Sequence, residues 1–100
     1  MTGTPSALDG LDPLLVAPKR LAIMAVLATS TTTDFAFLRG HLRVSDSDLS
    51  KQAAALEAAG YITIAKTGHG RGSATAYKAT KLGRHAYRQH RATLHNLLNG

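Results

Sequence analysis

The stretch from Ser45 to Tyr61, SDSDLSKQAAALEAAGY, constrains the fold more than any other part of the chain. Ser45 can cap a helix, and Asp48 completes a capping box and places a carboxylate in the positively polarised first turn. Apolar residues follow at the spacing of one helical face, and Gly60 stands where helices commonly end. The stretch therefore predicts one short amphipathic helix over residues 46–59. Its apolar stripe consists of Leu49, Ala53 and Leu56.

The face opposite this stripe is slim and polar. At about 100° per residue, it carries short side chains around a single cation. A helix with such a face can enter a groove. The residues on this face are Ser47, Ser50, Lys51 and Ala54.

The segment before this helix indicates a partner helix. Residues 34–42, DFAFLRGHL, indicate a second short helix, and residues 43–44 leave room for only a tight turn between the two. Residues 30–34, STTTD, are rich in β-branched and capping residues. We expect them to form a short strand that pairs with the wing described next, and Thr33 or Asp34 to cap the helix that follows.

The segment after the main helix indicates a hairpin. YITIAKT and ATAYKAT alternate as two strands, and GHGRGS between them supplies a glycine-rich turn. Helix, turn, helix and hairpin follow one another in the order of a winged helix-turn-helix. The expected fold is α+β and mainly α, with a two- or three-stranded β-wing and terminal dimerisation helices.

On these motifs the chain resembles the MarR/ArsR-like winged-helix regulators, especially a small single-domain group with the pattern DF..L...L..SD..LSK....LE.AGY. The likeness covers roughly residues 11–90. The resemblance implies a winged-helix fold that binds double-stranded DNA and pairs with a second copy of itself. The matching residues are Asp34-Phe35, Leu38, Leu42, Ser45-Asp46, Leu49-Ser50-Lys51 and Leu56-Glu57-Ala58-Ala59-Gly60-Tyr61.

The ends of the chain are predicted to differ in role from its centre. Residues 1–10 are small and polar, as in a flexible arm, and residues 11–98 would form the winged-helix domain. After a capping residue, Thr80, the last helix is expected over residues 81–98. Its apolar seam is predicted from Leu82, Ala86, Gln89, Thr93 and Leu97.

By resemblance, this last helix and the N-terminal segment would form a two-fold dimer interface. Asp12 followed by Pro13 suggests a capped start of the brief apolar segment LLVA. In a monomer these terminal leucines would be largely exposed, which favours association. The predicted interface residues are Leu11, Leu14, Leu15, Leu94, Leu97 and Leu98.

DNA contacts are expected from two elements. The helix over residues 46–59 would be the recognition helix and enter the major groove, and the wing, residues 66–75, would supply the second set of contacts. Gln52 lies at the edge of the apolar stripe, where it could still read an adenine with its amide. Glycines around Arg71 would let the wing approach the backbone or the minor groove, although a solvated loop tip is the plainer alternative. The candidate contact residues are Arg43, Ser45, Ser47, Ser50, Lys51, Gln52, Lys66, His69, Arg71 and Ser73.

The charge distribution agrees with a polyanionic partner. Residues 1–60 hold five cations and six acids, giving −1, whereas residues 61–100 hold seven cations and no acid, giving +7. The formal net charge of +6 therefore belongs to the wing and the last helix. This asymmetry is typical of nucleic-acid binding, although a basic helix can also be a merely solvated face.

Other function classes find little support. The chain has no cysteine, which excludes disulfides and thiolate metal sites, and no run approaches the roughly 20 apolar residues of a membrane span. Three histidines of the last helix, His85, His90 and His95, are spaced by five, so no two share the face that a metal pair needs. We expect a cytoplasmic protein that is not an enzyme and has no cofactor or metal.

The helix expected after Pro18 leaves one question open. Its apolar residues cover more than one face, which indicates the central support of the core. Part of the same surface would serve an effector pocket, in which Met24 is a suitable adaptable side chain. A small-molecule effector of unknown identity therefore stays open. The apolar residues are Leu21, Ile23, Met24, Val26 and Leu27.

We therefore predict a homodimeric transcription regulator, most simply a repressor. The alternative is a winged helix that docks onto another protein without binding specific DNA. The two differ in their response to salt, because a protein that neutralises several phosphates loses affinity as salt rises.

Overall fold

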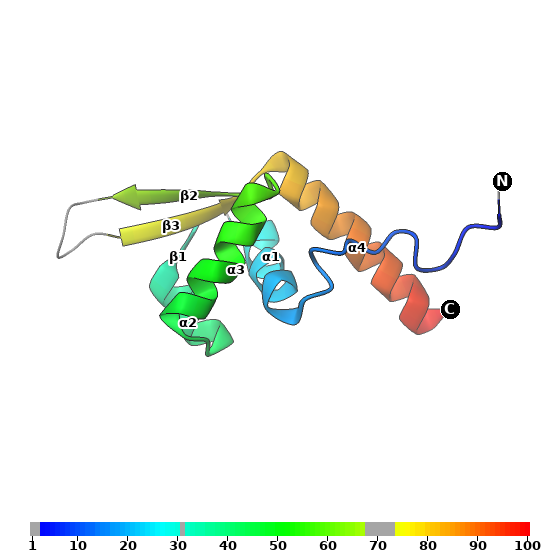
Figure 1. The fold of residues 1–100 in the computed structure, drawn as a ribbon, viewed down its shortest axis with the longest axis horizontal. Helices are drawn as coiled ribbons and strands as arrows, with labels where there is room; N and C mark the ends of the chain where they lie inside the picture. The colour runs from blue at the N-terminus through cyan, green and yellow to red at the C-terminus, as the bar shows by residue number, and fades with distance from the viewer. Residues whose placement is uncertain (1–2, 31, 68–73) are drawn as a thin grey trace.

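The computed structural model describes residues 3–30, 32–67 and 74–100. The elements follow the predicted order, and the predicted fold class, α+β and mainly α, is confirmed (Figure 1). They are α1 (Pro18–Thr29), β1 (Thr33–Asp34), α2 (Phe35–Leu42), α3 (Asp46–Ala58), β2 (Ile62–Thr67), β3 (Ala74–Ala79) and α4 (Lys81–Asn99).

The three strands form one antiparallel sheet in the order β1-β3-β2. In the hairpin, β2 pairs with β3 from Ile62 opposite Ala79 to Thr67 opposite Ala74. On the other side of β3, Thr33 pairs with Tyr77, which confirms that residues 30–34 contribute a short strand to the wing.

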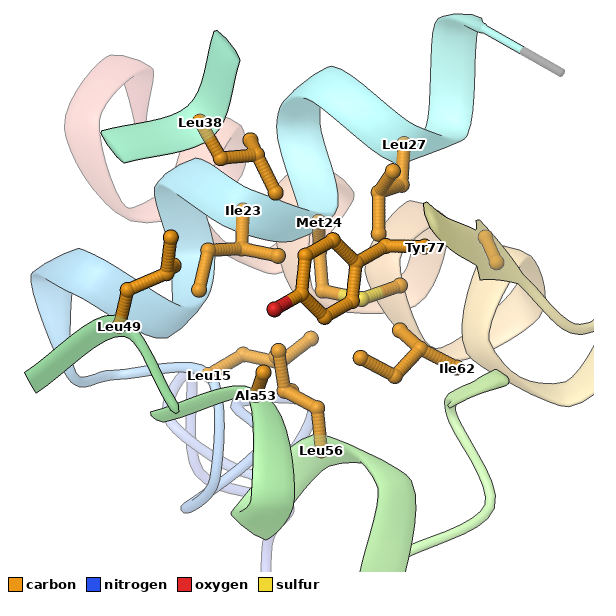
Figure 2. Close-up of a cluster of buried hydrophobic side chains, with 11 residues drawn as sticks. Leu15, Ile23, Met24, Leu27, Leu38, Leu49, Ala53, Leu56, Ile62 and Tyr77 are labelled. Atoms are coloured by element: carbon orange, nitrogen blue, oxygen red, sulfur yellow. The ribbon is translucent and has the colours of Figure 1, made fainter. Parts of the chain in front are cut away.

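The hydrophobic core surrounds α1. Ile23, Met24 and Leu27 of this helix are fully buried in one cluster with Leu56 of α3 and Tyr77 of β3 (Figure 2). Because α1 packs against α2, α3, α4 and β3, the prediction that it supports the whole domain is confirmed. Met24 has no exposed surface and belongs to this core.

The first helix of the helix-turn-helix has the predicted inward stripe. Leu38 is fully buried, and Phe35 and Leu42 pack against the core. The N-cap is Asp34, whose Oδ1 accepts a hydrogen bond from the Phe37 backbone N–H at 2.7 Å. Such a cap satisfies one of the free N–H groups at the start of a helix.

The last helix has the predicted N-cap and nearly the predicted ends, but only part of the predicted seam is turned inward: Ala86 packs against the core, and Thr93 and Leu97 are half-buried. Thr80 Oγ1 accepts a hydrogen bond from Gly83 N at 2.9 Å. Leu82 is 54% exposed and Gln89 is also exposed, so the predicted seam through these two residues is wrong. Gly83 and His90 are the buried residues of α4.

Two contacts explain this choice of face. A Cβ on Gly83 would lie 2.0 Å from the carbonyl oxygen of Tyr61, so only a glycine lets α4 pass this close to the end of α3. Further along, His90 Nδ1 accepts a hydrogen bond from the Asp12 backbone N–H at 2.9 Å. A backbone contact and a buried polar bond therefore contribute to the packing of α4, beside Ala86 and Tyr87, which pack against the core.

The N-terminal segment folds back onto the domain. Asp12 begins a single turn, in which Leu14 N donates to Asp12 Oδ1 at 2.8 Å and Leu15 N donates to Asp12 O at 2.9 Å. This turn places Leu15 in the chain's own core with no exposed surface. The prediction that Leu15 is exposed for a dimer interface is therefore wrong. Leu11 and Leu14 are half-buried.

The segment before this turn meets α4 at Gly10. Residues 3–10 are exposed, and a Cβ on Gly10 would lie 2.0 Å from Thr93 Oγ1, so the arm touches the helix there (Figure 1).

The molecule is elongated, with extents of 56 × 24 × 22 Å and a Cα radius of gyration of 15.3 Å. A compact domain of this length would have a radius near 13 Å. The hairpin and the end of α4 project on opposite sides of the domain (Figure 1). Within the described ranges, no helix is both long and apolar enough to cross a membrane.

Candidate nucleic-acid interface

The turn between α2 and α3 is as tight as the sequence predicts. Arg43 adopts the left-handed conformation, with φ at 55°, and Val44 N donates to Arg39 O at 3.3 Å. Both features are typical of a helix that ends abruptly. Arg43 itself is exposed beside the start of α3.

Helix α3, the predicted recognition helix, begins and ends as expected. Ser45 Oγ accepts a hydrogen bond from Asp48 N at 3.1 Å, which confirms the N-cap. At the other end, Gly60 has φ at 80°, and Gly60 N donates to Glu57 O while Tyr61 N donates to Leu56 O. This pair of bonds is the Schellman motif, in which a left-handed glycine satisfies the last carbonyls of a helix.

The capping box is only half formed. The Asp48 carboxylate accepts a hydrogen bond from Gln52 Nε2 at 3.0 Å and pairs with Lys19 Nζ of α1. These contacts, with Gln52 as the larger contributor, lower the pKa of Asp48 below its ordinary value. The carboxylate therefore stays ionised, and it fastens the first turn of α3 to α1.

Among the described residues, no hydrogen bond or ion pair joins the outward face of α3 to another element. Leu49, Ala53 and Leu56 are buried, as their spacing predicts, and the opposite face is exposed. The exposed residues are Ser47, Ser50, Lys51 and Ala54. The helix therefore presents a narrow, polar ridge with one positive charge.

The ridge continues onto the hairpin. Ser50 of α3 and Lys66 of β2 line the same shallow hollow, together with Thr75 of β3. Lys66 is exposed at the edge of the hollow. The two predicted contact regions, helix and wing, thus form one surface where they meet.

Two of the three acids of α3, Asp46 and Asp48, lie at its first turn, where they would face phosphates if left alone, whereas Glu57 is exposed in its last turn. Arg39 of α2 pairs with Asp46 at 2.9 Å, and Lys19 of α1 pairs with Asp48. Both pairs are substantially exposed, so each contributes little to stability. Their effect is electrostatic, because they offset negative charge at the end of the helix that would approach DNA.

Gln52 does not lie on the ridge. It is half-buried, its Oε1 accepts a hydrogen bond from an Arg20 terminal nitrogen at 2.9 Å, and its Nε2 donates to Asp48. Both polar groups of the amide are therefore occupied within the chain. An adenine contact would require these bonds to break.

Three candidate contact residues of the wing lie outside the described residues. They are His69, Arg71 and Ser73. Their role stays a prediction from the sequence.

The described residues hold no group of three or more histidine, aspartate or glutamate side chains suited to a metal ion. His90 is already bonded to the backbone of Asp12.

A family model for the winged helix DNA-binding domain matches residues 19–98. The chain belongs to this family. The match begins in the first turn of α1 and ends in the last turn of α4, so it includes the helix-turn-helix, the hairpin and the long final helix. The winged helix described above therefore belongs to a family of DNA-binding domains.

Solved structures share the same winged-helix fold. A transcriptional regulator homologue from Pyrococcus horikoshii OT3 is 22% identical, with a TM-score of 0.80 over 87% of this chain and 86% of the other. The YusO protein from Bacillus subtilis is 20% identical, with a TM-score of 0.73 over 95% and 67%. A zinc-responsive MarR family member from Lactococcus lactis is 16% identical, with a TM-score of 0.62 over 82% and 56%. No curated protein sequence matches the chain.

Two cations of α1 hold the first turns of α3, and no sequence motif predicted this role for them. Lys19 contacts Asp48 of α3, and Arg20 contacts Gln52 of α3. They stand in the first turn of α1, where positive charge is unfavourable to the helix dipole. Cations at that end of a helix are a sequence signal for partners elsewhere in the fold.

Proposed function

We propose that this winged helix protein is a homodimeric transcription regulator that places α3 in the major groove of double-stranded DNA. The observation that carries the proposal is the exposed ridge of α3 beside Lys66 of the hairpin, on a helix whose opposite face is fully buried. Short side chains let a helix backbone approach base edges closely. Serine hydroxyls can donate or accept there, and a lysine contacts guanine or phosphate.

The second part of the proposal is the dimer. Leu8, Val16 and Leu98 are 60%, 54% and 81% exposed, and they belong to the N-terminal segment and the end of α4. Together with half-buried Leu94 and Leu97 they extend the predicted interface, which no longer includes Leu15. Two-fold pairing through these ends would space two recognition helices about one duplex turn, roughly 34 Å, apart.

The third part is the direction of regulation. A dimer that covers two half-sites excludes other proteins from the same duplex by steric overlap, so repression is the simplest outcome. In a reporter assay, deleting the half-sites should raise expression. Lower expression after the deletion would reverse the sign of regulation and leave DNA binding intact.

A small-molecule effector belongs to the same proposal, and we assign it to an open groove of about 670 Å³ between α1 and α2. Ala22, Ala25 and Val26 of α1 line it, and Phe37 stands at its edge. Phe37 is 52% exposed and stacks on His41 with ring centroids 5.4 Å apart. A flat apolar molecule would cover this ring. A ligand screen should find compounds that raise the melting temperature and lower DNA affinity; without such compounds the effector is excluded from the proposal.

Selection of bound duplexes from a random pool tests the proposed function. We expect enrichment of palindromes with half-sites about one turn apart. Affinity for these duplexes should fall by orders of magnitude between about 50 and 200 mM salt. Failure to enrich any sequence, with binding that is insensitive to salt, would favour the alternative of a protein-docking module.

A further inference from the structure

A chain of hydrogen bonds connects the N-terminal segment to the recognition helix through one arginine of α1. Arg20 Nε donates to the Leu14 carbonyl oxygen at 2.7 Å, and a terminal nitrogen of the same guanidinium donates to Gln52 Oε1 at 2.9 Å. Arg20, Leu14 and Gln52 are all half-buried. Partial burial makes such charge-assisted bonds stronger than they would be on an open surface.

On the side of the recognition helix, the chain of bonds continues for one turn. Gln52 Nε2 donates to Asp48 Oδ1 at 3.0 Å, and the other carboxylate oxygen of Asp48 pairs with Lys19. The first two turns of α3 are thereby held to two successive residues of α1. The same two turns carry the exposed residues proposed to meet DNA, Ser47, Ser50 and Lys51.

On the other side, the Leu14 carbonyl is itself held in place. Leu14 N donates to Asp12 Oδ1, and Asp12 Oδ2 accepts a hydrogen bond from the Tyr61 hydroxyl at 2.5 Å. The Asp12 backbone N–H donates to His90 of α4. The acceptor that Arg20 binds is thus fixed to the end of α3 and to the middle of α4.

We propose that Arg20 and Gln52 are positioning residues for DNA recognition. They orient the outward face of α3 relative to α1 and the N-terminal segment, and they touch no base. The inference rests on the proposed function and adds the residues that orient its recognition surface. Arginine suits this place because its rigid fork reaches two acceptors at once, whereas the single ammonium nitrogen of lysine lacks that geometry.

Two other roles make different predictions. If Arg20 contacted a phosphate, its loss would weaken binding to every duplex and reduce the salt slope by about one. If Gln52 read a base, its loss would weaken the selected duplex whether or not Arg20 was present. A positioning pair acts as a unit, so that removing the second member changes little once the first is gone.

The test compares Arg20→Ala, Gln52→Ala and the double variant with the wild type, on selected and random duplexes across a salt series. We expect each single variant to lower affinity for the selected duplex by about tenfold, equivalent to one poorly placed base contact. Random-duplex affinity and the salt slope should be unchanged. The double variant should bind the selected duplex no more weakly than the single variant with the lower affinity. Arg20→Lys should lower this affinity as much as Arg20→Ala does.

Arg88→Ala, which removes an exposed cation from α4, is the matched control and should leave the ratio of selected to random affinity unchanged. Binding is measured well below the melting temperature of each variant. If Arg20→Ala does not fold, the affinities of Gln52→Ala and Gln52→Leu for selected and random duplexes are compared instead, because neither substitution changes the charge.

Equal losses on both duplexes, or additive losses in the double variant, would overturn the positioning role while leaving the proposed function intact. A wild type that enriches no duplex would instead overturn the proposed function, and this inference with it.

Discussion

The two longest helices, α3 and α4, are packed into the fold in different ways. α3 buries an apolar stripe, Leu49, Ala53 and Leu56, at no more than 1% exposure. α4 is longer, yet its buried residues are Gly83, against a backbone carbonyl, and His90, bonded to a backbone N–H. The helix proposed to meet DNA is therefore held by a buried apolar stripe, to which Asp48 and Gln52 add side-chain bonds to α1. The helix proposed to pair two copies packs Ala86 and Tyr87 against the core, and the specific contacts of Gly83 and His90 add to this packing.

The largest loss of stability is expected from shortening a side chain in the buried apolar stripe of α3. Leu56→Ala removes a fully buried side chain from the centre of the core (Figure 2). Such truncations lower the free energy of unfolding by about 2–5 kcal/mol. Chemical denaturation measures the loss, which is large for a domain of this size. A change below about 0.5 kcal/mol would show that α3 is not held by this stripe.

The next effect comes from the close approach of α4 to Tyr61. The Cβ added by Gly83→Ala would lie 2.0 Å from the Tyr61 oxygen, so backbone must move, and we expect a loss of about 1–3 kcal/mol or more. Gly40→Ala in α2 is the matched control, because its Cβ would meet nothing within 4 Å. Alanine favours helix, so the control should gain about 0.5–1 kcal/mol. Equal changes in both variants would show that the close approach of Gly83 to Tyr61 does not affect stability.

Tyr61 joins the two helices, and its titration tests that junction. The hydrogen bond to Asp12, followed by burial, raises the pKa of Tyr61 from 10.0 to about 12. Because the folded pKa is raised, this contribution to stability is complete below pH 10 and is lost as the pH rises towards about 12. Unfolding measured across this range should show the decline. Tyr61→Phe should be less stable at neutral pH and lack the Tyr61 part of the decline; an identical pH profile would contradict the junction.

The smallest difference concerns the two N-caps. Ser45→Ala and Thr80→Ala each remove a cap, which usually lowers stability by about 1 kcal/mol. Thr80 Oγ1 also donates to the Gly60 carbonyl at 2.6 Å. We therefore expect thermal and denaturant unfolding to show the larger loss for Thr80→Ala. A larger loss for Ser45→Ala would mean that this second bond adds nothing.

Elements with a regular pattern could be predicted from the sequence. The stripe of α3, its cap at Ser45 and its stop at Gly60 each follow from local rules, and the structure confirms them. The alternating strands and the short strand at Thr33 follow from the same kind of reasoning.

Contacts between distant segments could not be predicted in this way. Leu82 looked like a seam residue because it is apolar, but the nearby Gly83 decides which face of α4 can approach Tyr61. Leu15 looked exposed because its segment is short, but the turn at Asp12 carries it into the core. No periodicity reveals a partner that lies far away in the chain.

The same limit holds for the candidate site. The exposed residues of the ridge could be predicted from the helical period. The bonds that anchor α3 to α1 join side chains that lie far apart in the sequence, and no local pattern predicts them.

The most direct test of the central claim compares one charge on each of the two helices. Lys51→Ala removes the cation of the α3 ridge, and Arg88→Ala removes an exposed cation of α4. We expect the dissociation constant for the selected duplex to rise by about tenfold for Lys51→Ala and to stay within about twofold of wild type for Arg88→Ala. Equal effects, or a loss confined to Arg88→Ala, would contradict the claim that α3 presents the DNA-binding surface.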